Sequence, residues 1–194
     1  GRPVVVAALL HNNASPRTVF DDLEKISAAN RRGRRMLGAI SCCPLTMDFT
    51  LHSPYTFEGL AAWKPAMALT GAPYRRLLAE RSFRDAVRAE IARPAAFRLF
   101  SGDWDKVYVE HARLPQHQHW NQQTMAEIAR SSGADPLDAM LDLAIAEDLD
   151  TEFSALLLNS DEAAVGEMMR HPHSLVSLSD AGAHLTLFND AGFG

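Results

Sequence analysis

Two apolar runs flank a helical pattern near the start of the chain. Residues 3–10 are continuously apolar and rich in valine, which is typical of a parallel strand buried on both faces. Ser15-Pro16 begins a helix whose apolar positions recur at helical spacing until Gly33. Residues 36–43 form the second apolar run. A strand, a helix and a strand in this order predict a βαβ unit, and therefore the parallel sheet of an α/β protein.

The pattern changes over residues 45–120, where prolines and aromatic residues separate short apolar segments. Within this stretch, residues 82–92 predict a helix and residues 106–110 predict a short strand. Long connections inside a compact domain usually serve a function, such as covering a site. We therefore interpret residues 45–120 as a mostly helical insertion, or lid, within a single domain that spans residues 1–194.

Regular structure resumes after this insertion. Thr124 and Glu127 match a capping box at the start of a helix, and Asp135-Pro136 is typical of the start of the next one. The remaining predicted elements are a strand at 153–158, for which a helix is the alternative, a helix at 160–169 and a final buried strand at 175–178.

Composition limits the class of protein. The 194 residues are 47% hydrophobic and carry a formal net charge of −5, which gives no reason to expect nucleic acid or an anionic membrane as a partner. No apolar run approaches the roughly 20 residues that span a bilayer, and the first residues lack the pattern of a signal peptide. The two cysteines, Cys42 and Cys43, are adjacent and make no disulfide framework, which favours a reducing cytoplasm.

Two predicted strands are followed by side chains that can bind a metal or move a proton. His11 follows the strand at 3–10, and Asp180 follows the strand at 175–178. In α/β barrels the catalytic groups lie at the C-terminal ends of the strands. Each residue also has a simpler interpretation, His11 as a polar loop residue and Asp180 as the cap of a turn or helix.

The residues around Asp180 resemble a known family. The segment Leu-Ser-Asp-Ala-Gly-Ala-His at 178–184, with His171-Pro172 upstream and Asn-Asp-Ala-Gly at 189–192 downstream, is similar to the amidohydrolase superfamily, and within it to the D-aminoacylase (N-acyl-D-amino-acid deacylase) type. This resemblance implies an α/β fold, a partial TIM-like (β/α) barrel in which the chain supplies the last strands, 6 to 8. The stretch 45–120 corresponds to the variable insertion of that family.

The resemblance also implies an activity and roles for three residues. The parent enzyme would be a zinc-dependent hydrolase of non-peptide C–N bonds whose small-molecule substrate is an N-acyl-D-amino acid. Asp180 would be a metal ligand and the catalytic base that takes the proton of the attacking water, and His11 would be the metal ligand that follows strand 6. His184 would bind substrate, although it could instead hydrogen-bond the backbone of its own turn.

Several ligands of that family have no counterpart in this chain. The pairs His117/His119 and His171/His173 have the spacing of the superfamily's first-strand motif, but neither follows a buried strand, so we expect neither to bind metal. The bridging residue and the fifth-strand histidine are missing as well. We therefore expect the isolated 194 residues to bind metal poorly and to lack substantial hydrolase activity.

Two other functions are compatible with the same residues. The chain could be a non-catalytic α/β interaction domain that forms a homo-oligomer through exposed sheet edges, or part of a related amidohydrolase of cyclic amides. The catalytic hypotheses require His11 and Asp180 to face the same space, whereas the interaction domain does not. For Cys42 and Cys43, small buried thiols are favoured over reactive or metal-binding ones.

Overall fold

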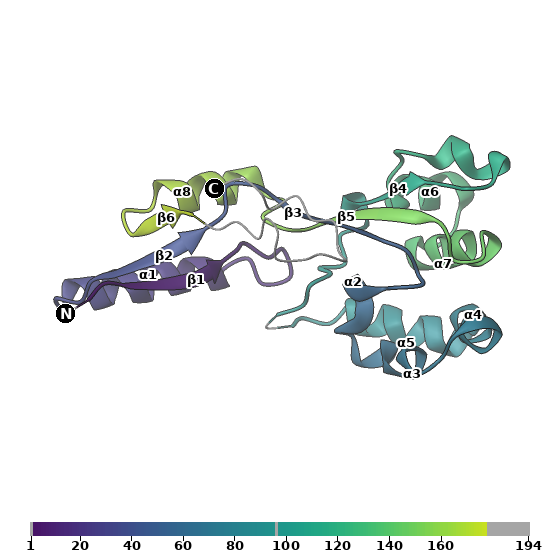
Figure 1. Cartoon of the computed structure of the whole chain (residues 1–194), viewed down its shortest axis with the longest axis horizontal. Helices are drawn as coiled ribbons and strands as arrows, with labels where there is room; N and C mark the ends of the chain where they lie inside the picture. Colours follow the sequence, from purple (N-terminus) through teal and green to yellow (C-terminus); the bar gives the residue numbers. More distant parts are fainter. Residues whose placement is uncertain (1, 96, 178–194) are drawn as a thin grey trace. The chain divides into compact units, whose positions relative to one another are not determined.

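The chain folds into two compact units. The computed structural model describes residues 2–95 and 97–177, so the predicted site residues Asp180 and His184 lie outside the described part. Unit 1 comprises residues 1–47 and 156–194, and unit 2 comprises residues 48–155 (Figure 1). Unit 2 therefore extends beyond the stretch 45–120, and the interpretation of one domain with an inserted lid stays a prediction.

Unit 1 contains a three-stranded parallel sheet. Its elements are β1 (Val4–Leu9), α1 (Thr18–Arg31), β2 (Met36–Ile40), α8 (Glu162–Arg170) and β6 (Ser174–Val176). The strand order is β1-β2-β6, and both neighbouring pairs are parallel. This confirms the predicted βαβ unit and the parallel sheet. The second strand is shorter than predicted, because it ends at Ile40 and the cysteines follow in a turn.

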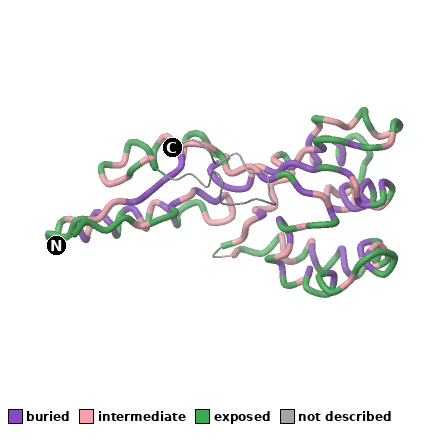
Figure 2. Tube along the Cα trace, in the orientation of Figure 1, coloured by how far each residue is buried: buried purple, intermediate pink, exposed green. Residues whose placement is uncertain are grey.

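The core of unit 1 covers one part of β1 only. Leu23 and Ile26 of α1 pack against Leu9 and other buried residues, while Val4 and Val5 are 51% and 52% exposed. Figure 2 shows this exposure along β1. The prediction that this strand is buried on both faces is wrong. Within the described residues β1 is an edge strand, and the helix α1 packs against it in a single core. A continuous apolar run therefore does not by itself mean that both faces of a strand are covered.

A second sheet has the strand order β3-β5-β4. Its strands are β3 (Leu45–Phe49), β4 (Val107–His111) and β5 (Glu152–Leu158), of which β4 and β5 are antiparallel. The helices of unit 2 are α2 (Tyr55–Glu58), α3 (Lys64–Met67), α4 (Gly71–Ala79), α5 (Arg81–Ile91), α6 (Met125–Ser132) and α7 (Pro136–Ala146), with 3-10 turns η1 (Ala61–Trp63), η2 (Trp104–Lys106) and η3 (Pro115–Trp120). The predicted strands at 106–110 and 153–158 are confirmed, whereas β3 was not expected.

Helix α6 begins as the sequence predicts. The Thr124 hydroxyl accepts a hydrogen bond from the Glu127 N–H at 3.1 Å, and the Glu127 carboxylate accepts one from the Thr124 N–H at 2.8 Å. The Thr124 hydroxyl also donates to the Glu127 carboxylate at 3.0 Å. The two bonds to the carboxylate, first that from the main-chain N–H of Thr124, lower the pKa of Glu127 below its ordinary value. The helix ends at Gly133, whose φ of +69° is the left-handed conformation that glycine adopts without steric cost.

Aromatic side chains give unit 2 a core of its own. Phe57 stacks on Trp63 at a centroid distance of 5.2 Å and meets Phe100 edge-on at the same distance. Phe49 of β3 stacks on Phe153 of β5 at 5.6 Å. These pairs, which contribute about 0.5–1.5 kcal/mol each beyond simple burial, show that the aromatic-rich stretch is a packed structure and not a loose loop.

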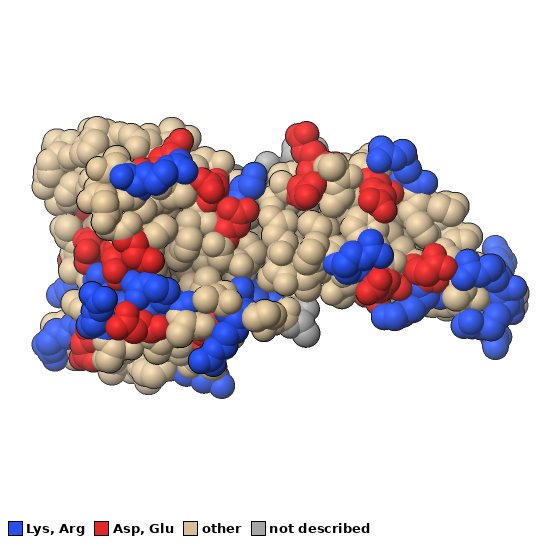
Figure 3. All heavy atoms as spheres, turned by 180° about the vertical axis from the view of Figure 1, so that it is seen from behind, with Lys and Arg blue, Asp and Glu red and all other residues tan. Residues whose placement is uncertain are grey.

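Ion pairs connect α5 to α7 in unit 2, from a buried Arg84 and a half-buried Arg88. Arg88 lies 3.1 Å from Asp135 and 2.9 Å from Asp138, and Arg84 lies 2.7 Å from Asp142. The Asp135 carboxylate, with smaller contributions from its neighbours, raises the pKa of Arg88. Acidic and basic side chains are interspersed over this part of the molecule (Figure 3). Pairing of this kind orients the two helices but adds little stability where the charges are solvated.

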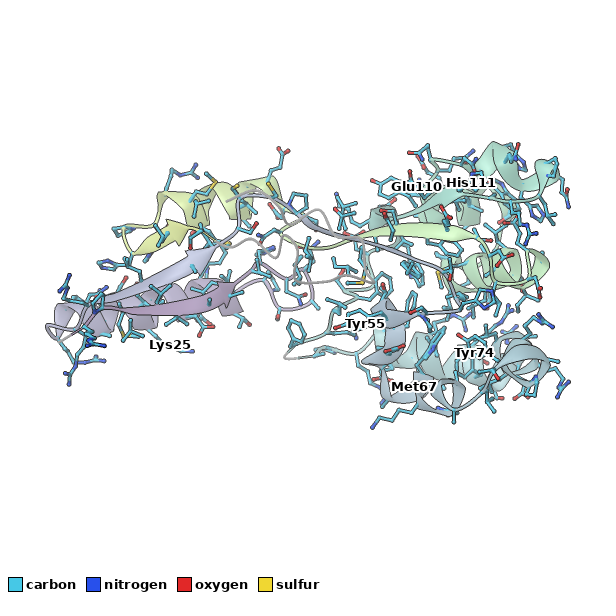
Figure 4. The ribbon with its side chains drawn as sticks, viewed as in Figure 1. Lys25, Tyr55, Met67, Tyr74, Glu110 and His111 are labelled. Atoms are coloured by element: carbon cyan, nitrogen blue, oxygen red, sulfur yellow. The ribbon has the colours of Figure 1, made fainter. Side chains whose placement is uncertain are left out.

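Two buried polar atoms of unit 2 lack hydrogen-bond partners among the described residues. They are Nε1 of Trp63 and the hydroxyl of Tyr74, and both side chains line a hollow of about 240 Å³. Tyr74 is labelled in Figure 4. Burial raises the pKa of the Tyr74 phenol well above its usual range, and the Trp63 indole N–H, which lies nearby without the geometry of a hydrogen bond, opposes that rise in part. An unpaired hydroxyl in this position lowers the stability of the folded state.

We expect the Tyr74→Phe substitution to leave the free energy of unfolding unchanged or to increase it by up to about 1 kcal/mol, because it removes a buried hydroxyl that has no partner. Thermal and urea denaturation measure the change. Tyr55→Phe is the matched control, since Tyr55 is 46% exposed and its hydroxyl stays solvated. A loss of stability larger than that of the control would mean that the Tyr74 hydroxyl is hydrogen-bonded.

Candidate functional site

Asn159 connects the segment that follows β1 to the segment that follows β2 in unit 1. It directly follows β5, is 3% exposed and has a left-handed φ of +54°. Its main-chain N–H donates to the carbonyl of His11 at 2.9 Å, and its side-chain Oδ1 accepts from the His11 N–H at 2.7 Å. Asn159 therefore forms hydrogen bonds with both the N–H and the carbonyl of His11.

The same side chain reaches the turn that follows β2. Its Nδ2 donates to the carbonyl of Ser41 at 3.1 Å and to the carbonyl of Cys43 at 3.3 Å. Asn159 thus joins the chain after β1 to the chain after β2. Sequence reasoning missed this residue. Its local signal was an asparagine directly after a buried strand, the residue type that most readily adopts a left-handed conformation after glycine.

His11 lies at the carboxyl end of β1, as predicted. It is 3% exposed, and its Nδ1 is buried without a hydrogen-bond partner among the described residues. Its ring is tilted against Phe20, with centroids 6.3 Å apart. A buried ring nitrogen is costly unless it has a hydrogen-bond partner or a metal ion to bind, and a neutral imidazole nitrogen is a common metal ligand. This nitrogen therefore fits the role of a metal ligand.

The strand that precedes Asp180 is aligned with β2. In the parallel pair, Val176 is level with Ile40, and the Ser177 N–H donates to the Ile40 carbonyl at 3.2 Å. The carboxyl ends of β2 and β6 consequently lie at the same edge of the sheet. Asp180 itself and His184 fall outside residues 2–95 and 97–177, so the predicted convergence of His11 and Asp180 stays a prediction.

In the part of the chain that the structure describes, no group of three or more His, Cys, Asp or Glu side chains could hold a metal ion. His11 is the candidate nitrogen ligand there. In each of the pairs His117/His119 and His171/His173, a ring nitrogen lies near a polar side chain. Nδ1 of His117 lies 2.9 Å from Oε1 of Glu147, and Nε2 of His171 lies 3.2 Å from the Ser27 hydroxyl. Burial, with the nearby His173, lowers the pKa of His171.

The two cysteines lie in the turn after β2. Cys42 and Cys43 are half-buried, with their Sγ atoms 3.7 Å apart, and they form no disulfide. The prediction that they are buried core thiols is therefore wrong. The reason is the early end of β2 at Ile40, which leaves both cysteines beyond the sheet.

No protein-family model and no curated protein matches the sequence. Three solved structures of D-aminoacylase show a low similarity, each with 12% identity over 90% of this chain and 25% of theirs. One concerns the binuclear metal centre of D-aminoacylase and has a TM-score of 0.35. Another defines a novel subset of amidohydrolases and has a TM-score of 0.34, and the third, at 0.35, is a mutant in complex with CuCl2.

The chain spans about a quarter of the length of these structural neighbours, which are hydrolases. A TM-score below 0.5 does not establish a common fold, so the partial barrel stays a prediction. In residues 2–95 and 97–177, every helix is too short or too polar to cross a membrane.

Proposed function

We propose that this chain is the C-terminal part of a zinc-dependent amidohydrolase that hydrolyses the amide bond of N-acyl-D-amino acids. The observation that carries the proposal is the state of His11. It is a buried histidine at the carboxyl end of a parallel strand, with its main chain held by Asn159 and its Nδ1 without a partner among the described residues. Parallel α/β folds place metal ligands at this edge of the sheet.

In this proposal His11 supplies one nitrogen ligand and Asp180 supplies a carboxylate ligand. The alignment of Ser177 with Ile40 supports the position of Asp180, since it brings the strand before Asp180 to the edge where β2 ends. A bound zinc ion supplies the Lewis acidity that makes water nucleophilic near neutral pH. Asp180 takes the proton of the attacking water and passes it to the leaving amine, and His184 orients the substrate.

A second candidate is a non-catalytic interaction domain that forms a homo-oligomer through its sheet edge. The exposure of Val4 and Val5 on the edge strand β1, together with Leu175 at 42% exposed, favours this function. It makes no use of the Nδ1 of His11, which is buried without a partner among the described residues, and we therefore prefer the hydrolase.

Zinc binding by the 194-residue chain tests the role of His11. We expect weak binding at one site, measured by isothermal titration calorimetry, because few ligands are present. The His11→Ala substitution should weaken it by at least about tenfold, since even the outer hydrogen-bond partners of a metal ligand commonly contribute 10–100-fold to affinity. His119→Ala is the matched control, because His119 is exposed and should leave the affinity unchanged. Equal affinities for the two variants would remove His11 from the site.

The activity is tested on a full-length protein that contains this chain. We expect zinc-dependent release of free D-amino acid from N-acyl-D-amino acids, and its loss in the Asp180→Asn variant. Hydrolysis of cyclic amides in place of these substrates would favour the related amidohydrolase. Concentration-dependent self-association without any metal-dependent hydrolysis would favour the interaction domain.

A further inference from the structure

The adjacent thiols of Cys42 and Cys43 form a second site that the proposed hydrolysis does not use. We propose that this pair is a dithiol site that binds one thiophilic metalloid centre, trivalent arsenic, through both sulfur atoms. The inference begins with their separation, since the two Sγ atoms are 3.7 Å apart and half-buried, so a small reagent can reach them.

This separation suits two bonds to a single soft centre. Two sulfur atoms bonded to one tetrahedral ion at about 2.3 Å each lie about 3.8 Å from one another, and the smaller S–As–S angle of pyramidal arsenic(III) shortens this by a few tenths of an ångström. The observed 3.7 Å is close to that value, so the thiols of Cys42 and Cys43 need little rearrangement to bind together. Soft thiolate ligands also prefer soft, polarisable centres over hard ones such as Mg²⁺.

The backbone that carries the thiols is held by hydrogen bonds. The Ser41 hydroxyl accepts from the Cys43 N–H at 3.2 Å and donates to the Cys43 carbonyl at 3.3 Å. The Asn159 side chain donates to the carbonyls of Ser41 and Cys43. Because this turn is fixed before any ligand arrives, less conformational entropy is lost on binding than in an unstructured Cys-Cys pair.

A pair of thiolates suits a centre whose remaining position is already filled. Within the described ranges no third His, Cys, Asp or Glu joins the pair to complete a metal site. An organic arsenic(III) oxide needs only two thiolates, because its carbon substituent occupies the third position on arsenic. In the reaction two As–S bonds form and the As–O bonds break. Both thiol protons leave with the oxygen as water, and arsenic stays trivalent, so no oxidant or reductant is required.

The test titrates the reduced chain with phenylarsine oxide and follows it by intact mass and by thiol alkylation. The sequence has two cysteines, so no other thiol competes. We expect one arsenical per chain, added with loss of one water, and protection of both cysteines from iodoacetamide. Excess 2,3-dimercaptopropanol should reverse binding, whereas an equal thiol concentration of 2-mercaptoethanol should not.

The single variants Cys42→Ser and Cys43→Ser should each bind phenylarsine oxide at least roughly a hundredfold more weakly, because linkage of the two thiols is what raises the affinity. Circular dichroism checks that each variant is folded, and the alkylation result on the unmodified chain needs no variant at all. Addition of two arsenicals per chain, addition of none, or unchanged affinity in either serine variant would overturn the dithiol site.

Discussion

Replacement of Asn159 by alanine is expected to lower the free energy of unfolding by at least about 3 kcal/mol. The substitution removes the acceptor of the His11 N–H and the donor to the Ser41 carbonyl, and buried groups left unpaired cost about 1–3 kcal/mol each. Alanine must also adopt the φ of +54° at this position, which adds about 1–2 kcal/mol. Urea denaturation of the purified chain measures the sum.

Three further variants separate these contributions. Asn159→Gly tolerates the left-handed backbone and should show the loss of the hydrogen bonds alone. Asn159→Asp keeps an acceptor for His11 but turns a second oxygen toward the carbonyls of Ser41 and Cys43, so it should also destabilise. Asn13→Ala is the control in the same region, because Asn13 is half-exposed, and should cost less than about 1 kcal/mol. An Asn159→Ala loss no larger than that of the control would contradict the structural role.

The parallel sheet could be predicted because the patterns that indicate it lie within short stretches of the sequence. Two continuous apolar runs, at 3–10 and 36–43, with an amphipathic helix between them are compatible with few arrangements other than a βαβ unit. The structure has β1, α1 and β2 at these positions. Strand β3 was missed although Met47 and Phe49 are buried on either side of exposed Asp48, which is a strand alternation. The alternation is too short to stand out in a stretch broken by prolines.

The burial of β1 shows a different limit. An apolar run indicates that a strand can be buried on both faces, but it does not say which residues cover each face. Val4 and Val5 are exposed because, in the described residues, β1 pairs with β2 alone and the core that α1 forms reaches only another part of the strand. Such tertiary context overrides a local pattern.

The position of His11 could be predicted from the sequence, whereas that of Asn159 could not. His11 was identified because it follows a recognisable strand, and the structure places it at that strand end. Asn159 was not identified because its partner His11 lies 148 residues away in the sequence. The hydrogen bond between them depends on how the strands are arranged, and no spacing rule within a short window predicts it.

Glu147 is the second position where we expect a large effect, since Glu147→Gln should lower the free energy of unfolding by about 2–4 kcal/mol at neutral pH. The carboxylate is buried and accepts from the N–H groups of Arg113 and Leu114 at 2.8 and 3.0 Å. It also accepts from the Thr151 hydroxyl at 2.9 Å and lies 2.9 Å from Nδ1 of His117. A glutamine has one acceptor oxygen, and its NH₂ group would face these donors.

The effect of Glu147→Gln should shrink as the pH falls, and this dependence distinguishes lost charge from lost packing. Burial by itself raises the pKa of Glu147. The N–H groups of Leu114 and Arg113, with His117 and Thr151, outweigh burial and hold the pKa below its ordinary 4.5.

A carboxyl whose pKa is lower in the folded state stabilises the protein above its unfolded pKa, and this stabilisation is lost as the pH falls through the folded value. Denaturation at pH 7 and near pH 3 should therefore show a smaller difference between wild type and Glu147→Gln in acid. Glu110→Gln, an exposed control, should show no comparable change (Figure 4). A difference that stays constant or grows in acid would mean that the charge of Glu147 does not hold this part of unit 2 together.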